Sequence, residues 1–396
     1  MSNPALKFPL LAAIAAAAAA LAGCSDASAD SPPGFVVSPR GLDTNAGTES
    51  APFRSLKQAL LVAKPGDTVR LENGTYDAAD GETWDYAAAE GVTISGESAE
   101  QTLLQAPLPD GGFVPDMPVA TESQVIALQA SSKLTLQNLS LVGFYQGLEF
   151  TAPAQVALRH VVIRDGITAL QILASDCQVE LEDTTLSILE GEGSALKLID
   201  TSQGGQISLK RTTVTGGVFV AGADAKLSID DSTLDGNSKN AAVNFAGATL
   251  EIAGSQLRSD AAPYAISMHG GALSLEGTRV EGGNYALYQL GGSSKLRNTQ
   301  LLNYASIGLY FASGNLDLGT QTEAGNNTLT DRGGSTEALG IYVDTGTAPV
   351  TSSNTSFDGV IPPAGTVQAG VDEIVAPGEY FITPGQSMQF FDAPAR

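Results

Sequence analysis

Two neighbouring segments of the chain, between residues 250 and 290, repeat one pattern. Four residues of the first segment are each followed, 23 positions later, by a residue of the same kind: Leu250 by Leu273, Ile252 by Leu275, Ser255 by Thr278 and Leu257 by Val280. In both copies apolar residues alternate, a glycine follows, and two more alternating positions precede a third apolar run. Three short strands in about two dozen residues are typical of one turn of a parallel β-helix.

The same register extends in both directions from this pair. Coils begin, in chain order, at Leu134, Val156, Val179, Ile207, Leu227, Leu250, Leu273 and Ser294. A loop at residues 190–194 accounts for the longest interval between starts. Because a solenoid grows by adding coils, the length of the chain requires no second domain. We therefore predict an all-β protein, a single right-handed three-sheet parallel β-helix.

The sixth position of successive coils carries a series of hydroxyl groups. It has the same parity as the apolar eighth position, so these side chains should point inward. The series comprises Thr184, Thr212, Ser232, Ser255, Thr278 and Thr299. At the strand spacing of roughly 4.8 Å, we expect a ladder inside the coil in which each hydroxyl bonds a neighbouring one.

The first 23 residues have the composition of an export signal. Lys7 precedes an apolar stretch, residues 8–20, that is too short for a membrane span. Residues 21–24, ending in Cys24, then resemble the lipobox of bacterial lipoproteins. The resemblance implies cleavage before Cys24 and its lipidation, and two or more acyl chains hold a protein stably on a bilayer. The alternative is an ordinary secretory signal with an incidental cysteine.

The lipobox resemblance also predicts a location. Ser25 follows the cysteine, and by the sorting rule of enteric bacterial lipoproteins this favours the outer membrane. We expect a signal peptide at residues 1–23, a polar tether at 24–34, and a cell-envelope protein attached to the membrane by its lipid anchor.

Several short motifs lie between residues 36 and 76. They are Gly41 to Asn45, Gly47-Thr48, Ala51-Pro52-Phe53, Pro65-Gly66-Asp67 and Gly74-Thr75-Tyr76. Together they resemble an uncharacterised family segment that opens many bacterial β-helix proteins of the pectin-lyase-like superfamily. Phe53, Leu56, Leu60 and Ala63 would share one face of a helix that begins after Ser50 and caps the first coil. We expect the N-terminal cap and first coils at 35–112.

The coil pattern weakens toward the C-terminus. Leu316 and Leu318 keep the first positions of a coil, but Gln321 and Glu323 stand where a hydroxyl and an apolar residue are expected. We therefore expect β-helix coils over residues 113–345 and an irregular C-terminal cap over 346–396.

Charge and cysteine content limit the partners of the protein. The formal net charge is −23 and no basic run exists, so nucleic acid binding is excluded. An acidic polysaccharide would be repelled unless a divalent cation bridged it. With Cys24 lipidated, Cys177 has no disulfide partner, and its parity predicts a buried thiol. We expect no cofactor and no metal.

Three short motifs contain residues of types that catalyse sugar cleavage. Asp230-Asp231 and His269-Gly270 resemble parts of the motifs of polygalacturonase-type glycoside hydrolases, but the register places them on different faces, and that family's other motifs are missing. Arg164-Asp165 has no second carboxylate converging on it by register. We predict no catalytic residue. At the fourth and fifth positions of successive coils, charges of opposite sign alternate instead. This pattern predicts ladders of ion pairs on the surface.

The third strand of each coil has a distinctive outward column. In chain order its residues are Glu149, Gln171, Lys197, Asn244, Ser267, Tyr288, Tyr310 and Tyr342. The tyrosines, flanked by the amides Asn244 and Gln171, would form a platform for stacking sugar rings. The alternative is a row covered by the C-terminal segment. Tyr264 and Tyr285 have inward parity and are expected at the rim of the core.

Three functions remain open at this point. The first is a non-catalytic envelope protein that binds a glycan or another surface partner along the third sheet. The second, implied by the superfamily, is a polysaccharide lyase or glycoside hydrolase. The third is a structural spacer without a ligand.

Overall fold

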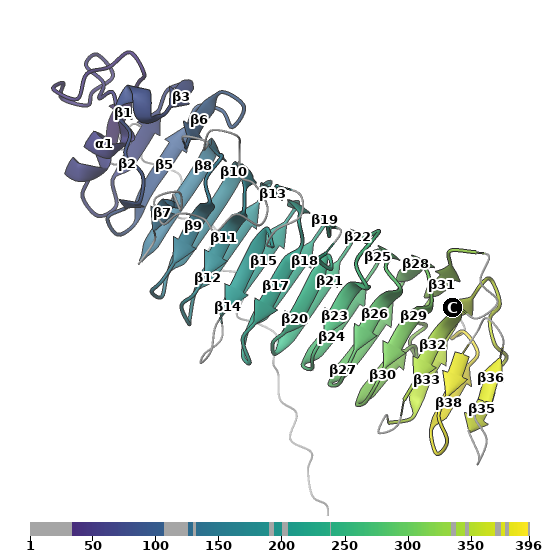
Figure 1. The fold of residues 1–396 in the computed structure, drawn as a ribbon. Coiled ribbons are helices and arrows are strands. Elements are labelled where there is room, and N and C mark those ends of the chain that lie inside the picture. The colour runs from purple at the N-terminus through teal and green to yellow at the C-terminus, as the bar shows by residue number, and fades with distance from the viewer. Residues whose placement is uncertain are drawn as a thin grey trace, which may run out of the picture. The chain divides into compact units, whose positions relative to one another are not determined.

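The computed structural model describes residues 34–106, 126–129, 132–189, 194–199, 205–237, 239–333, 338–344, 348–368, 374–376 and 380–394. They belong to one compact unit that begins at Gly34, and this unit is a stack of parallel coils (Figure 1). The predicted signal peptide, Cys24 and the loop at 190–193 lie outside the described residues. Within the described ranges, no helix has the length and apolar character needed to span a membrane.

Each coil contributes one strand to each of three walls. The first wall consists of β1 (Gly34–Val37), β2 (Thr68–Leu71), β5 (Val92–Gly96), the first half of β8 (Lys133–Val142) and of β10 (Gln155–Gly166), β12 (Gln178–Glu182), β15 (Gln206–Lys210), β18 (Lys226–Asp230), β21 (Thr249–Ala253), β24 (Ala272–Glu276), β27 (Ser293–Arg297), β30 (Asn315–Leu318), β33 (Val350–Ser353) and β38 (Ser387–Phe391).

The second wall follows the first after a sharp corner. It consists of β3 (Gly74–Tyr76), β6 (Thr102–Gln105), the second halves of β8 and β10, β13 (Thr185–Ile188), β16 (Thr213–Thr215), β19 (Thr233–Asp235), β22 (Gln256–Ser259), β25 (Arg279–Gly282), β28 (Gln300–Tyr304), β31 (Thr328–Asp331) and β34 (Ser356–Phe357). Because β8 and β10 run unbroken through the corner, the first two walls form one hydrogen-bonded sheet.

The third wall is a separate sheet. It consists of β4 (Tyr86–Ala87), β7 (Ile126–Gln129), β9 (Gln146–Phe150), β11 (Thr168–Ile172), β14 (Leu196–Ile199), β17 (Val218–Ala221), β20 (Val243–Ala246), β23 (Tyr264–Met268), β26 (Tyr285–Gln289), β29 (Ile307–Phe311), β32 (Leu339–Val343), β37 (Tyr380–Ile382) and β36 (Ile374–Ala376). Its pairings are parallel except at β36, which runs antiparallel to β37.

The predicted coil register is confirmed. Leu250 pairs with Leu273, and every predicted start from residue 134 to residue 294 pairs with the next one. The apolar residues of all three walls point into one continuous core, in which Cys177 is 1 % exposed, as predicted. Stacking of equivalent positions therefore holds along the first wall, and columns of outward residues can be compared coil by coil.

The inner hydroxyl column exists, but its bonds differ from those expected. All six hydroxyl residues are buried. Instead of bonding one another, most of these hydroxyls donate to a backbone carbonyl of the preceding coil: Thr212 bonds Leu181 O at 3.2 Å and Thr278 bonds Ile252 O at 3.2 Å. Their oxygens also accept backbone N–H groups, as Ser232 Oγ does from Thr212 N at 3.0 Å. The ladder thus satisfies corner backbone groups that would otherwise be buried without partners.

One residue per coil turns the corner between the first and second walls. From Asn138 to Asn354 this position has a φ of 48–57°, a left-handed conformation that glycine and asparagine adopt most readily. Glycine occupies it at Gly254 and Gly277. His160 and Arg211 also occupy it, and each lies beside Asp183, at 3.6 and 2.7 Å. The predicted surface ladder of charges is therefore present.

The capping helix begins later than predicted. Helix α1 covers Leu56–Val62, and its N-cap is Ser55, whose side chain accepts Gln58 N at 3.1 Å. Phe53 lies before the helix and bridges to β1. The cause is Asp43, whose carboxylate accepts the backbone N–H groups of residues 54 and 55 at 2.9 Å and holds that stretch extended.

The coils continue past the boundary predicted at residue 345. A loop at residues 319–325 shifts the pattern, so Asn327 and Leu329 fill the hydroxyl and apolar positions, and not Gln321 and Glu323. Strands β33, β34, β37 and β38 then pair in parallel with earlier coils. The regular pattern ends at the antiparallel strands β36 and β35 (Gly365–Gln368).

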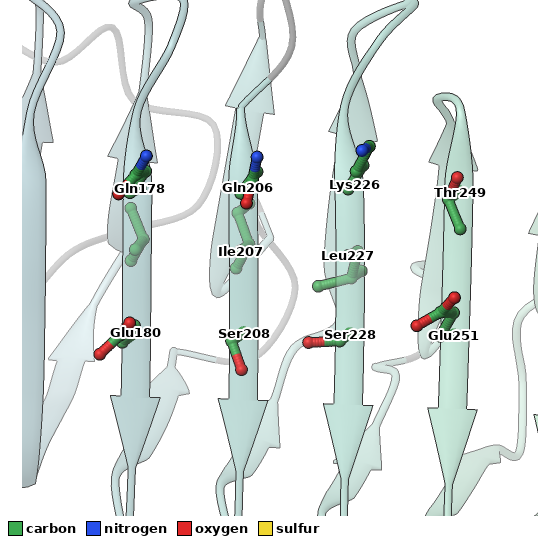
Figure 2. A pocket seen from close by; sticks show the side chains of 11 residues that line it. Gln178, Glu180, Gln206, Ile207, Ser208, Lys226, Leu227, Ser228, Thr249 and Glu251 are labelled. Atoms are coloured by element: carbon green, nitrogen blue, oxygen red, sulfur yellow. The ribbon is translucent and has the colours of Figure 1, made fainter. Parts of the chain in front are cut away.

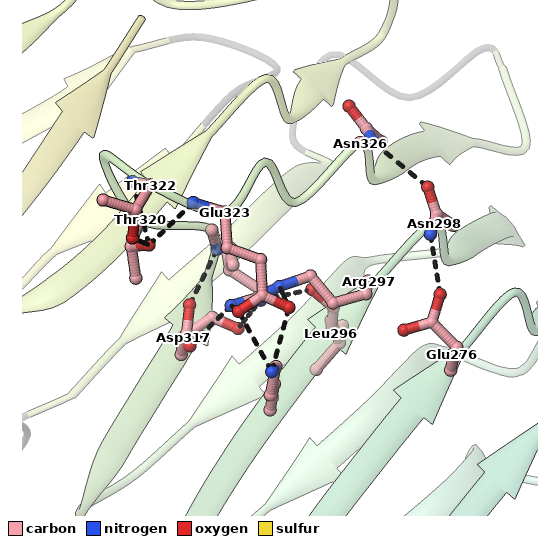
Figure 3. A network of polar contacts seen from close by, with 12 residues as sticks. Glu276, Leu296, Arg297, Asn298, Asp317, Thr320, Thr322, Glu323 and Asn326 are labelled. Atoms are coloured by element: carbon pink, nitrogen blue, oxygen red, sulfur yellow. Dashed lines mark hydrogen bonds and ion pairs between the residues drawn. The ribbon is translucent and has the colours of Figure 1, made fainter. Parts of the chain in front are cut away.

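The 319–325 loop is attached to the first wall by a buried arginine. The side chain of Arg297 is 3 % exposed and contacts Asp317 at 2.7 Å and Glu323 at 3.1 Å. Glu323 also contacts Lys295 at 3.0 Å. Figure 3 shows this network beside the external row in which Asn326 bonds Asn298 and Asn298 bonds Glu276. Glu323 thus fixes the loop instead of filling a core position.

Candidate binding surfaces on the third and first walls

The predicted tyrosine row is a continuous column on the third wall. Strand pairing places Tyr288 beside Tyr310, Tyr310 beside Tyr342, and Tyr342 beside Phe381. All four side chains are half-buried. Sequence analysis did not include Phe381, because β37 follows a stretch without the repeat. The C-terminal segment thus adds a strand and a ring to the column, and the three tyrosines keep part of their surface exposed.

The rings of this column are stacked on one another. The ring centroids of Tyr288 and Tyr310 are 4.9 Å apart, those of Tyr310 and Tyr342 are 5.2 Å apart, and those of Tyr342 and Phe381 are 4.5 Å apart. The angles between ring planes are 13°, 22° and 13°. Each inner ring therefore has a neighbour on both faces. The column presents ring edges to solvent, and this differs from the predicted platform of open faces.

Tyr264 extends the column by one coil. Its ring lies 4.6 Å from that of Tyr288. The outward residue of its own strand is Ser267, which is 3 % exposed, and so small a side chain leaves room for the Tyr264 ring. Tyr285 lies alongside, 5.5 Å from Tyr288 and 6.1 Å from Tyr310. These two tyrosines, predicted at the core rim, belong to the outer column.

We call the six rings of Tyr264, Tyr285, Tyr288, Tyr310, Tyr342 and Phe381 the aromatic column. It crosses five coils, a length of about 19 Å at the strand spacing. The Tyr310 hydroxyl donates to Asp344 at 2.8 Å, and burial together with this bond raises the pKa of Tyr310 well above its usual range. Burial also raises the pKa of Tyr288. The phenols of Tyr310 and Tyr288 therefore remain uncharged at neutral pH.

The two amides predicted to flank the tyrosines lie farther along the same wall. Asn244 pairs with Ser267 and so stands one coil beyond Tyr264. Gln171 is three coils farther, after Lys197 and Phe219, and accepts a bond from Gln146 at 2.9 Å. Asn244 is thus close enough to share a ligand with the column, whereas Gln171 is about 24 Å from Tyr288.

A second surface, which sequence analysis did not identify, is a hollow on the first wall. It has a volume of about 440 Å³ and crosses β12, β15, β18 and β21. Figure 2 shows its polar side chains in two rows. One row is Gln178, Gln206, Lys226 and Thr249, and the other is Glu180, Ser208, Ser228 and Glu251. The small Ser208 and Ser228 leave the space between the two glutamates.

The residues whose types could be catalytic do not come together in the structure. Asp231 lies in the corner after β18 on the first wall, whereas His269 follows β23 on the third wall and contacts only its neighbour Ser267, at 3.2 Å, among the side-chain bonds of the described chain. Arg164 and Asp165 contact each other. No group of three or more metal-ligating side chains occurs in the described ranges.

A smaller hollow on the second wall, of about 300 Å³, brings together Asp260, Glu281 and Arg332. Asp260 is bound to Arg258, which lowers the pKa of this carboxyl. Glu281 is bound to Arg279 at 3.0 Å. Because both carboxylates are already engaged by arginines, they do not form the acid and base pair that glycoside hydrolysis requires.

The chain is similar to several solved structures at low identity. It resembles the A-module of mannuronan C-5 epimerase AlgE4 of Azotobacter vinelandii, with 12 % identity, a TM-score of 0.48, and coverage of 84 % of this chain and 91 % of that chain. It also resembles a rhamnogalacturonan lyase, with 14 % identity, a TM-score of 0.46, and coverage of 83 % and 88 %. These are similarities of fold.

Comparison of sequences gives a relative and a family. The uncharacterised protein YwoF of Bacillus subtilis (strain 168) is 39 % identical over 82 residues, and the match spans 18 % of this chain and 18 % of that protein. A family described as a protein of unknown function, DUF1565, matches residues 39–364. The match starts in the predicted opening segment and continues through the coils. Since it covers most of the 396 residues, the chain belongs to the DUF1565 family.

Proposed function

We propose that this protein is a non-catalytic, lipid-anchored protein of the cell envelope that binds a neutral glycan along the aromatic column. The observation that carries the proposal is the column itself: six aromatic rings contact one another on one wall, and their edges are partly exposed to solvent. Soluble proteins rarely expose a contiguous aromatic surface of this kind, and where they do it often marks a binding site.

The orientation of the rings favours a ligand rich in oxygen atoms. An aromatic ring is electron-rich on its faces and electron-poor at its edge. The edges of the stacked tyrosines therefore offer polarised C–H groups to the hydroxyl and ring oxygens of a sugar, and their phenol oxygens can accept hydrogen bonds from sugar hydroxyls. Sugar faces would find no open ring face inside the stack, so we expect contact with ring edges.

The charge of the protein favours a neutral ligand. The formal net charge is −23, and Asp344 lies beside the column. A polymer of uronic acids would approach a surface of its own sign and be repelled.

Affinity electrophoresis through gels containing neutral polysaccharides tests this proposal. Tyr310→Ala removes a ring with stacked neighbours on both sides, and we expect the retardation of the protein to be lost. Tyr310→Phe keeps the stack and removes only the hydroxyl that donates to Asp344, so retardation should weaken less. Phe219→Ala is the matched control, because Phe219 faces outward on the same wall, two coils from Ser267. Equal retardation of Tyr310→Ala and the wild type would refute the proposed site.

The same protein preparation separates the two alternatives. Incubation with neutral and uronic-acid polysaccharides, with and without Ca²⁺, should release neither reducing ends nor unsaturated products. Release of either would identify an enzyme and overturn the non-catalytic function. If Tyr310→Ala changes the thermal stability but no tested glycan retards the wild type, the column is a structural ladder and the protein is a spacer.

The lipid anchor is a separate part of the proposal. It rests on the lipobox-like residues that end at Cys24. Replacing Cys24 with serine should move the protein from the membrane fraction to the soluble fraction, since no acyl chain is then attached. An unchanged distribution would contradict the anchor without affecting the glycan site.

A further inference from the structure

We propose that the hollow on the first wall is a second binding site for a neutral glycan, so that one molecule holds two glycan chains on different walls. This site is independent of the aromatic column, since it crosses β12 to β21 whereas the column crosses β23 to β37. Binding at this site does not require the proposed function above. Only the simultaneous holding of two glycan chains rests on it.

The polar side chains of the hollow have no partners within the described protein. Eight polar side chains line it, and within the described chain none of them has a hydrogen bond or an ion pair. The corner next to it differs, because there Arg211 contacts Glu182 at 2.6 Å and Asp183 at 2.7 Å. The two rows of the hollow therefore offer free donors and acceptors side by side.

The shape of the hollow also favours a linear ligand. Ser208 and Ser228 lie between Glu180 and Glu251, which occupy the same row three coils apart, about 14 Å at the strand spacing. Gln178 and Gln206 border this floor in the neighbouring row (Figure 2). The result is an open, elongated hollow that runs across the strands, and it suits a short stretch of a linear chain.

The chemistry of the lining points to sugar hydroxyls. Amide, hydroxyl and carboxylate groups are the side chains that donate to and accept from a polyol without requiring charge on it. A polyanion is disfavoured by Glu180, Glu251 and the net charge of −23. Lys226 lies in the centre of the first row, so that with Glu180 and Glu251 the lining carries a net charge of only −1 and does not require a charged ligand.

A peptide fits this surface poorly. The strands β15 and β18 are paired on both sides, so they offer no free edge to which an extended peptide could add. The apolar residues of the lining, Val179, Ile207 and Leu227, are at most 3 % exposed and so provide no apolar pocket for a side chain. A neutral oligosaccharide is the ligand that remains.

Filling the hollow is the direct test. Ser228→Leu places a branched side chain at an outward strand position, which β-strands accept, and occupies the floor. Gln206→Ala removes one amide with little change of shape. Thr135→Leu is the control, since Thr135 faces outward in the same row two coils before Glu180 and lies outside the hollow.

The full chain, purified in detergent, is titrated with oligosaccharides of mixed-linkage β-glucan, galactomannan and dextran. For the probe that binds, we expect two sites per molecule, and Ser228→Leu should remove one of them. Gln206→Ala should weaken that site about fivefold, the effect of losing one hydrogen bond. Thr135→Leu should change neither site.

Further outcomes decide between ligands and between sites. Preferential binding of oligogalacturonate or of glucosamine oligomers at the Ser228-dependent site would overturn the neutral ligand, and titrations unchanged by Ser228→Leu would overturn the site. If Tyr310→Ala removes one site and Ser228→Leu the other, wild-type protein should cross-link the polysaccharide and raise its viscosity, whereas either variant alone should not. If the wild type shows no Tyr310-dependent binding but does show Ser228-dependent binding, the proposed function fails and the first-wall site is supported.

Discussion

Replacement of Asn327 tests the inner column at a coil where an asparagine stands in place of serine or threonine. Asn327 is 2 % exposed and its Oδ1 accepts the backbone N–H of Thr299 at 3.1 Å. Its Nδ2 donates to the carbonyls of Leu296 and Leu318 at 3.1 and 3.3 Å. Asn327→Leu keeps the branched shape and removes every one of these bonds, whereas Asn327→Thr restores the hydroxyl that other coils carry.

The free-energy cost of Asn327→Leu follows from the backbone groups that lose a hydrogen-bond partner. The carbonyl of Leu296 keeps a donor, Arg297, at 2.8 Å, and that of Leu318 keeps Thr355 at 3.0 Å. The N–H of Thr299 loses its acceptor in a buried place, which costs about 2 kcal/mol. Local opening around β28 and β31 should then become about thirtyfold more frequent, since 1.4 kcal/mol is a factor of ten. The threonine variant should cost under about 1 kcal/mol.

Hydrogen exchange of the backbone amides in β28 and β31 measures this opening. We expect the leucine variant to exchange about thirtyfold faster than the wild type, and the threonine variant to stay within about fivefold. Amides of β12, far along the stack, serve as the internal control. If the leucine variant exchanges as slowly as the wild type in β28 and β31, the ladder does not stabilise the coils and the reasoning fails.

Three further predictions concern the corner and ionisable groups. Gly277→Val should destabilise the protein by about 1–2 kcal/mol in thermal melts, because Gly277 has a φ of 57° and a Cβ there meets nothing within 4 Å, so the cost is backbone strain alone; Gly277→Asn should be tolerated, and equal losses would contradict this. Burial raises the pKa of Tyr76, Tyr86 and Tyr304 above the ordinary value of 10.0, so their contribution to stability is complete below pH 10 and falls as the pH rises further; a melting temperature that holds constant well above pH 10 would disprove it. The bond to Arg211 lowers the pKa of Asp183 below its ordinary 3.8, so its contribution is complete above that pH and is lost as the pH falls; Arg211→Ala should therefore matter at pH 7 and not in strong acid, as melts at both pH values will show.

The stack of coils could be predicted because inward and outward side chains alternate along each strand and the pattern returns at a nearly constant interval. The pairing of Leu250 with Leu273 follows from alternation and a constant interval, and an error of one residue would have turned apolar side chains to solvent. The insertion at residues 190–194 was placed correctly, but the one after Leu318 was not. The loop at residues 319–325 moved the hydroxyl position to Asn327, and nothing in the preceding pattern signals how many residues such a loop takes up.

The binding surfaces were less accessible to prediction. Tyr288, Tyr310 and Tyr342 were found because they share one outward column. The stacking of their faces depends on ring rotation, which parity does not determine, and Tyr264 joins only because Ser267 is small. The first-wall hollow is defined by side chains that do not bond to the protein. Sequence shows that Ser208 and Ser228 are small and polar, but only coordinates show that their neighbours leave them free.

The hydroxyl column also gives the solenoid a direction. The hydroxyls of Thr184, Thr212 and Thr299 each donate a hydrogen bond to a carbonyl of the coil synthesised before it, at 3.2–3.3 Å. Each of these three carbonyls is therefore in place when its donor arrives, whereas N–H groups such as that of Thr212 gain their acceptor, Ser232 Oγ, only from the following coil. Assembly can proceed from the amino end in step with delivery of the polypeptide, one turn at a time.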